Sequence, residues 1–280
     1  TRGEVAVGHS VRGLAVSADS KRLVVTRFIS PQNHGEIIEI DASGLSIVRT
    51  IRLALDPGPD AEDSGRGVPN YLSTVTISPD GLRAWLPSKK DNTVRGLARD
   101  GQPLTFESAV RAIVSQIDLQ NNSELLAERL DLNDRNMPFA VQFSPLGDYA
   151  FVAVMGNDMV EVRDAYDGSL VTAIEQTGRA PQGLAFDASG QRLFVKNFMS
   201  RTVSVYDVSE IIASRDNSAP KLAEIVTVGS EKLNPMVLRG KQLFYNASDV
   251  RISRDSYLSC ASCHLDGDQD GRIWDFTDRG

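Results

Sequence analysis

Short apolar runs separated by tight polar turns recur four times along most of the chain. Each turn begins with Ser or Asp and most end with Gly, as a type I turn prefers. An apolar run precedes and follows each turn, so the pattern predicts four β-hairpins. The turns are Ser17-Ala18-Asp19-Ser20, Ser78-Pro79-Asp80-Gly81, Ser144-Pro145-Leu146-Gly147 and Asp187-Ala188-Ser189-Gly190.

The runs that flank these turns have the length and composition of short β-strands. A third strand follows each hairpin, alternates apolar and polar residues and ends in Asp, and a fourth strand is expected after it. Four strands per repeat predict a propeller blade. The predicted strands are 14–16, 75–77, 140–143 and 184–186 before the turns, 22–25, 83–86, 149–152 and 192–195 after them, and 37–41, 114–118, 160–164 and 203–207 as third strands.

The step from Ser144 to Asp187 is the shortest between successive turns, so it is the basic repeat and the longer steps contain insertions. The longest insertions are expected as loops at 56–70 and 87–108, both at the second repeat. These loops are expected to carry a locally basic character, although ordinary solvated loops are the favoured interpretation. The basic residues are Lys89, Lys90, Arg95 and Arg99.

The Ser-Pro-Asp-Gly turn and the Val-Ser-Val-Tyr-Asp strand at 203–207 make the chain resemble the YVTN family of β-propeller repeats. The resemblance implies a mainly β fold with the four visible blades as part of a larger propeller. Residues 4–8 resemble the blade-ending strand at 225–229. We therefore expect further blades upstream and the chain to be a fragment.

The only two cysteines lie in Cys260-Ala261-Ser262-Cys263-His264, the C-x-x-C-H pattern that attaches a c-type haem covalently. In this interpretation both cysteines form thioethers to the haem and His264 is the proximal iron ligand. A structural disulfide and half of a zinc site are the alternatives. Zinc would need a fourth ligand such as Asp266 or Asp268. Haem c is the favoured cofactor.

The segment before the motif predicts a short helix over 236–245, because its apolar positions suit one helix face. Residues 240–245 together with 258–264 resemble the first haem-binding segment of bacterial dihaem cytochrome c peroxidases and their methylamine-utilisation relatives. The resemblance implies that Leu243 and Phe244 pack against the haem ring, whereas packing in an ordinary helix core is the alternative. It also implies blades over 1–232 and the start of an α-helical cytochrome c domain over 233–280.

A distal iron ligand and a calcium site are two further possibilities in this part of the chain. No distal ligand is assigned: Met236 is the nearest methionine, and His9 and His34 fall in predicted loops. Residues 266–271 match the start of an EF-hand calcium loop, but the twelfth position is Thr277 instead of Glu, so a solvated acidic turn is favoured over calcium. Trp274 is expected to pack in a core, with packing on the haem or electron relay as the alternative.

A net charge of -7 and the lack of a basic patch with aromatics argue against nucleic-acid binding. No apolar run is long enough for a membrane span, and covalent haem attachment indicates an exported bacterial protein, periplasmic or extracellular. The predicted function is electron transfer or peroxidase-type chemistry with a redox protein or small molecule as partner. The alternative is a non-catalytic propeller scaffold with a redox tether. Dihaem relatives carry a second haem motif, and this chain has no further cysteine, so catalysis stays open.

Overall fold

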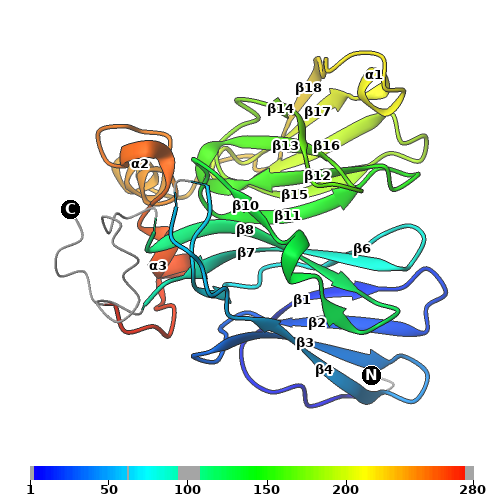
Figure 1. Cartoon of the computed structure of the whole chain (residues 1–280). Helices are drawn as coiled ribbons and strands as arrows, with labels where there is room; N and C mark the ends of the chain where they lie inside the picture. Colours follow the sequence, from blue (N-terminus) through cyan, green and yellow to red (C-terminus); the bar gives the residue numbers. More distant parts are fainter. Residues whose placement is uncertain (1–2, 62, 94–107, 275–280) are drawn as a thin grey trace. The chain divides into compact units, whose positions relative to one another are not determined.

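The computed structural model describes residues 3–61, 63–93 and 108–274, which form antiparallel sheets with a few short helices (Figure 1). The chain divides into two compact units. The first comprises Thr1–Asp134 with Ser262–Gly280, and the second comprises Arg135–Ala261. Each unit contains two sheets, and each is described separately below.

The first sheet of unit 1 contains four strands in sequential antiparallel order: β1 (Val11–Val16), β2 (Arg22–Arg27), β3 (His34–Asp41) and β4 (Ser46–Ala54). Its first hairpin closes at the predicted turn, where the Ser20 amide donates to the Ser17 carbonyl at 2.8 Å. The Ser17 hydroxyl donates to Asp19 at 2.6 Å. This local hydrogen bonding explains why the turn forms where the sequence predicted it.

The second sheet of unit 1 is built on two long strands, β7 (Arg83–Asp91) and β8 (Val110–Asp118). β7 pairs with both β5 (Val68–Asn70) and β6 (Thr76–Ile77), and β8 pairs with β9 (Ser123–Glu124) and β10 (Leu130–Leu132). The helix η1 (Leu126–Glu128) lies between β9 and β10. The two sheets share a buried apolar core of Val24, Ile37, Ile51, Leu53, Leu72, Val75, Ala84, Leu86, Ile117 and Leu119.

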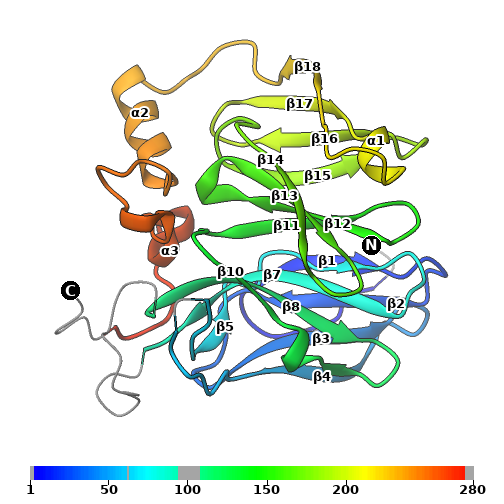
Figure 2. The same ribbon diagram turned by 45° about the horizontal axis from the view of Figure 1, so that its top comes forward.

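Unit 2 repeats the four-strand arrangement twice, as Figure 2 shows. Its third-repeat sheet contains β11 (Pro138–Phe143), β12 (Tyr149–Val154), β13 (Met159–Asp164) and β14 (Leu170–Ile174). Its fourth-repeat sheet contains β15 (Pro181–Phe186), β16 (Arg192–Asn197), β17 (Thr202–Asp207) and β18 (Lys221–Val226). The short helices η2 (Met155–Asn157) and α1 (Ser209–Ile212) connect strands.

The equivalent turns of the two sheets of unit 2 touch each other. A Cβ built on Gly190 would lie 2.3 Å from Cγ of Pro145, and Gly190 has φ of +73°. Glycine is therefore required at this turn for both space and backbone conformation. The sheets also share a buried core that includes Phe151, Val162 and Leu193.

The strands predicted for all four repeats are confirmed, including the unspecified fourth strands. Three sheets have four strands in the meander order of a propeller blade, whereas the second sheet has divided outer strands, β5 with β6 and β9 with β10. The fold is mainly β. Residues 4–8 are not a strand; Val5 and Val7 instead pack against Val25, Ile38 and Ile40 on the first sheet.

The expected basic loop at 87–108 is wrong at its start. β7 continues to Asp91, so Pro87, Lys89 and Lys90 are strand residues. Both lysine side chains are fully buried and ion-paired, because each finds two carboxylates. Arg95 and Arg99 lie outside the described residues.

The chain after β18 contains the predicted helix as α2 (Pro235–Phe244). Asn234 caps this helix by accepting from the Met236 amide at 2.9 Å, and Pro235 occupies the first turn. Three short elements follow: η3 (Arg254–Ser256), α3 (Ala261–His264) and η4 (Leu265–Gly267). The unit boundary falls within α3 and not near residue 232, so a separate haem domain stays a prediction.

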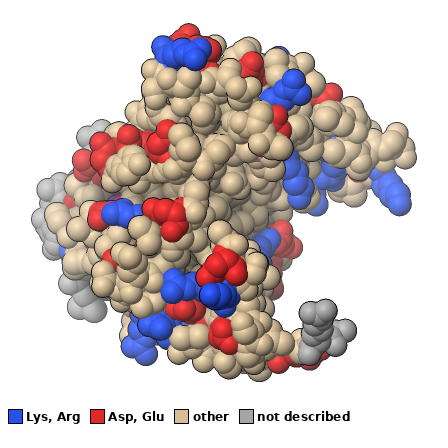
Figure 3. Space-filling view, turned by 90° about the vertical axis from the view of Figure 1, so that its right-hand side faces the viewer, with Lys and Arg blue, Asp and Glu red and all other residues tan. Residues whose placement is uncertain are grey.

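Charged side chains of both signs alternate over the face shown in Figure 3. In the part of the chain that the structure describes, no helix has the length and apolar character needed to cross a membrane.

Candidate functional site

The C-x-x-C-H motif is presented on a single helical turn. Cys260 and His264 are exposed and Cys263 is half-buried, whereas Ala261 and Ser262 between them are fully buried. Neither cysteine is part of a disulfide. Accessible thiols and an accessible imidazole are the donor set that covalent haem attachment needs, so the residues present fit haem c.

The zinc and calcium interpretations depend on carboxylates that have other partners in the structure. Among the described residues, no group of three or more His, Cys, Asp or Glu side chains is placed to hold a metal ion. Of the two carboxylates offered as a zinc ligand, Asp266 pairs with Arg12 at 2.8 Å.

Carboxylates at the start of the supposed calcium loop likewise contact cationic side chains and a hydrogen-bond donor of the protein. Asp266, at its first position, contacts Arg12, and Asp270, at its fifth, contacts Lys89 at 2.7 Å. Asp270 also accepts from the Trp274 indole at 2.9 Å. Thr277 lies outside the described residues. The first and fifth carboxylates are thus bound to protein groups instead of converging on one point.

Tyr71 holds the motif helix from unit 1. Its hydroxyl donates to the Cys263 carbonyl oxygen at 2.9 Å and accepts from the Leu265 amide at 3.3 Å. The ring is buried and stacks on Phe28 with a centroid separation of 4.6 Å and an interplanar angle of 5°. Burial raises the pKa of the Tyr71 phenol far above its usual range, aided by the negative charge of Asp270. Tyr71 is therefore a neutral, fixed donor at all ordinary pH values.

Lys89 lies beneath the same segment. Its side chain is 1% exposed, and its ammonium contacts Asp91 at 3.0 Å and Asp270 at 2.7 Å. The nitrogen also lies 4.4 Å from the centroid of the Tyr71 ring and 5.3 Å from that of Trp274. Two carboxylates and two aromatic faces replace the water that this ammonium loses on burial.

Arg272 joins the same buried charge cluster from the segment after the motif. Its guanidinium contacts Asp91 at 3.2 Å and donates to the Pro31 carbonyl at 2.9 Å. The Asn70 side chain donates both to Asp91 at 2.8 Å and to the Asp270 carbonyl at 3.0 Å. Ion pairs and hydrogen bonds therefore hold residues 270–274 against the ends of β5 and β7.

Within unit 2, Asn136 holds the residues that precede the motif. Its amide donates to the Tyr257 carbonyl at 2.6 Å, and its oxygen accepts from the Ser259 hydroxyl at 3.0 Å. Nearby, the Ala247 amide donates to the Gly156 carbonyl at 2.8 Å. Both Asn136 and Tyr257 are buried, so these bonds are shielded from water.

Leu243 and Phe244, the predicted haem-packing residues, are half-buried at the end of α2. Phe244 lies edge-on to Tyr245 with centroids 5.3 Å apart, and Tyr245 lies edge-on to Phe198 at 5.8 Å. These contacts dock α2 on the fourth-repeat sheet. The contact of Leu243 and Phe244 with a haem stays a prediction.

The candidates for a distal ligand occupy different settings. Met236 is 83% exposed on α2, and His9 is exposed. His34 begins β3, and its two ring nitrogens lie 2.6 Å from Asn33 and 2.8 Å from Glu36. His34 would have to release one of these partners to bind a metal through that nitrogen. No distal ligand is assigned.

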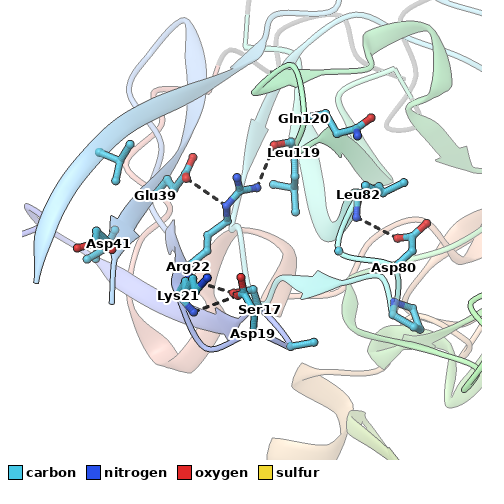
Figure 4. Close-up of a pocket in the computed structure, with 15 residues that line it drawn as sticks. Ser17, Asp19, Lys21, Arg22, Glu39, Asp41, Asp80, Leu82, Leu119 and Gln120 are labelled. Carbon is cyan, nitrogen blue, oxygen red and sulfur yellow. Dashed lines mark hydrogen bonds and ion pairs between the residues drawn. The ribbon is translucent and has the colours of Figure 1, made fainter. Parts of the chain in front are cut away.

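Unit 1 also contains a cavity of about 610 Å³ near the hairpin turns of the first two repeats, drawn in Figure 4. The Arg22 guanidinium points between Glu39, 3.1 Å away, and the Leu119 carbonyl, 2.9 Å away. Asp19 and Asp80 come from equivalent turns of the two sheets. A smaller cavity of about 410 Å³ adjoins the segment after the motif and includes Arg12, Phe28, Leu265, Asp266 and Asp268 in its lining.

Sequence reasoning missed Tyr71, Lys89 and Asn136. Lys89 follows Pro87 and precedes another lysine, a run that indicates a solvated loop when taken alone. Tyr71 and Asn136 carry no local signal, because their partners lie more than 100 residues away in sequence. The acidic run 266–270 was the available hint, since buried lysines need carboxylate partners.

No protein-family model and no curated protein matches this chain. Among solved structures it is similar to hydrazine synthase from Kuenenia stuttgartiensis, with 16% identity, a TM-score of 0.45 and coverage of 81% of this chain and 77% of that one. A functionally unknown protein from Desulfotomaculum acetoxidans is similar at 13% identity and a TM-score of 0.47, covering 76% of this chain and 55% of that one.

A β-propeller domain from Myceliophteria thermophila is similar at 13% identity and a TM-score of 0.43, covering 80% of this chain and 74% of that one. The chain thus spans about half the length of the Desulfotomaculum protein. Similarities this distant carry no argument about the function of this chain.

Proposed function

We propose that this protein is an exported bacterial redox protein with haem c attached at Cys260, Cys263 and His264. The observation that carries the proposal is the presentation of two thiols outside any disulfide and an exposed imidazole on one helical turn. Bound haem would supply one-electron chemistry at its iron. The blade-like sheets would form part of a β-propeller that supports this segment and docks a redox protein or small molecule.

The residues would act in distinct ways. Each thiol would add its S–H across a vinyl group, so that sulfur bonds to one carbon, hydrogen bonds to the other and no oxidant is consumed. The His264 imidazole would donate its lone pair to iron. Tyr71 and Asn136 would keep the backbone on either side of the helix in place, since each binds a carbonyl oxygen there.

Peroxidase chemistry is the more specific form of this proposal and rests on the resemblance of residues 240–245 and 258–264 to dihaem peroxidases. A second candidate function is a binding or scaffold protein in which the haem does not turn over. The cavity of about 610 Å³ supports this second function, because a ligand could enter it without contacting the motif.

Covalent haem is tested by producing the protein in a bacterial host with a cytochrome c maturation system. The intact mass after acid-acetone extraction and the pyridine haemochrome spectrum report covalent attachment. The proposal fails if the folded protein retains no haem under conditions that mature a control cytochrome. High-spin haem that reacts with peroxide supports the peroxidase, whereas six-coordinate inert haem supports a carrier or scaffold.

A further inference from the structure

Lys89 places a positive charge directly beneath the haem motif. The residue is 1% exposed, and its neighbours are Tyr71, which binds the Cys263 carbonyl, and Asp270. Although burial opposes its charge, the carboxylates of Asp91 and Asp270 raise the pKa of the Lys89 ammonium. The lysine therefore stays protonated.

The charges around this position balance. Lys89 and Arg272 are positive, whereas Asp91 and Asp270 are negative, and all four side chains are at most 4% exposed. Charges that are removed from water are poorly screened by solvent and salt. Loss of one member therefore leaves a net charge beside Cys263 that counterions cannot readily neutralise.

We propose that Lys89 sets the reduction potential of the haem by holding this buried charge behind Cys263. The inference rests on the proposed function, since it concerns the haem attached there. Reduction adds one electron to iron, so a nearby positive charge favours the reduced form and raises the potential. A net negative charge favours the oxidised form and lowers the potential.

The neighbouring Lys90 is a matched control. It is equally buried on the same strand, but its ammonium contacts Asp56 at 2.7 Å and Asp131 at 2.9 Å. Successive side chains of a strand point to opposite faces. Lys90→Met therefore removes a comparable buried cation without touching the cluster of Lys89, Asp91, Asp270 and Arg272.

The experiment compares midpoint potentials of haem-loaded proteins by optical redox titration at low and high salt. Lys89→Met should lower the potential at both salt concentrations, and Lys89→Arg and Lys90→Met should leave it close to that of the wild type. Asp270→Asn should raise it, because that change leaves a net positive charge. The double variant Lys89→Met with Asp270→Asn should return toward the wild-type potential, since the cluster is neutral again.

Two outcomes would overturn the inference. One is a Lys89→Met protein that has the wild-type potential. The other is a double variant whose potential is as low as that of Lys89→Met. A shift that persists when the cluster is neutral again would come from altered structure and not from charge. If Lys89→Met alone fails to fold, Asp270→Asn and the double variant still decide the question. Wild-type protein that binds no haem would instead refute the proposed function.

Discussion

The hydroxyl of Tyr71 donates to the carbonyl oxygen of Cys263 across 2.9 Å, joining two residues almost 200 positions apart in sequence. The bond fixes one end of the motif helix to the segment that follows β5. Tyr71 also stacks on Phe28, and this contact orients its ring. Residues beside β5 therefore hold the haem-binding segment.

Tyr71→Phe should loosen the motif helix while keeping the stack on Phe28. Loss of the hydroxyl leaves the Cys263 carbonyl without this donor, which we expect to cost about 1–3 kcal/mol of unfolding free energy. The Cys263 thiol should be alkylated faster than in the wild type. Urea unfolding measures the stability, and mass-resolved alkylation measures the reactivity of the thiol. Tyr166→Phe is the control, because Tyr166 is exposed. Unchanged stability and alkylation would show that the bond does not hold the helix.

Gly156→Ala should displace Asn136 and free the backbone before the motif. A Cβ at Gly156 would lie 2.3 Å from the Asn136 side-chain oxygen. Overpacking of this kind costs about 1–3 kcal/mol. Gly240→Ala is the control, because nothing lies within 4 Å of its Cβ and alanine favours the helix. Thermal unfolding should show a lower melting temperature for Gly156→Ala and a higher one for Gly240→Ala. Equal melting temperatures would contradict the placement of Asn136.

Asp91→Asn should be strongly destabilising. Asp91 is fully buried and pairs with Lys89 and Arg272, so its neutralisation leaves an excess of buried positive charge. Breaking a buried ion pair from one side costs about 3–5 kcal/mol. Glu210→Gln, which removes an exposed pair with Arg215, should change stability by less than about 1 kcal/mol. Chemical denaturation measures both variants, and a cost for Asp91→Asn as small as that of the surface variant would refute the buried network.

The repeated turns should contribute to acid unfolding. Hydrogen bonds from Ser78 and from the Leu82 amide lower the pKa of Asp80 below 3.8, and those from Ser17 and Lys21 do the same for Asp19. A lowered folded-state pKa gives stability that is present above pH 3.8 and is lost as pH falls through the folded value. Asp80→Asn should therefore reduce the loss of stability between about pH 5 and pH 2.

Unfolding free energies at several pH values test this turn effect. An unaltered acid slope for Asp80→Asn would mean that the turn carboxylate binds its proton equally well in the folded and unfolded chain.

His264→Ala should separate attachment from iron ligation. We expect the protein to keep the covalent haem mass because Cys260 and Cys263 remain, but to change its absorption spectrum because the proximal nitrogen is lost. Serine at both cysteines should instead abolish covalent attachment. An unchanged spectrum in His264→Ala would show that another residue binds the iron.

The sequence by itself determined the local elements. The four Ser- or Asp-led turns, their flanking strands and the helix near 235–244 follow from short-range rules, because turn chemistry and alternation act between close neighbours. The C-x-x-C-H spacing likewise identifies a candidate cofactor without any structure.

Only the tertiary structure decided what surrounds that motif. Lys89 belongs to a buried strand and not to a basic loop because Asp91 and Asp270 compensate its charge, and Asp270 lies 181 residues away. Tyr71 and Asn136 likewise meet their partners only when distant segments pack together. Burial and charge compensation depend on neighbours in space. The sequence therefore identified the motif but not the residues that hold it in place.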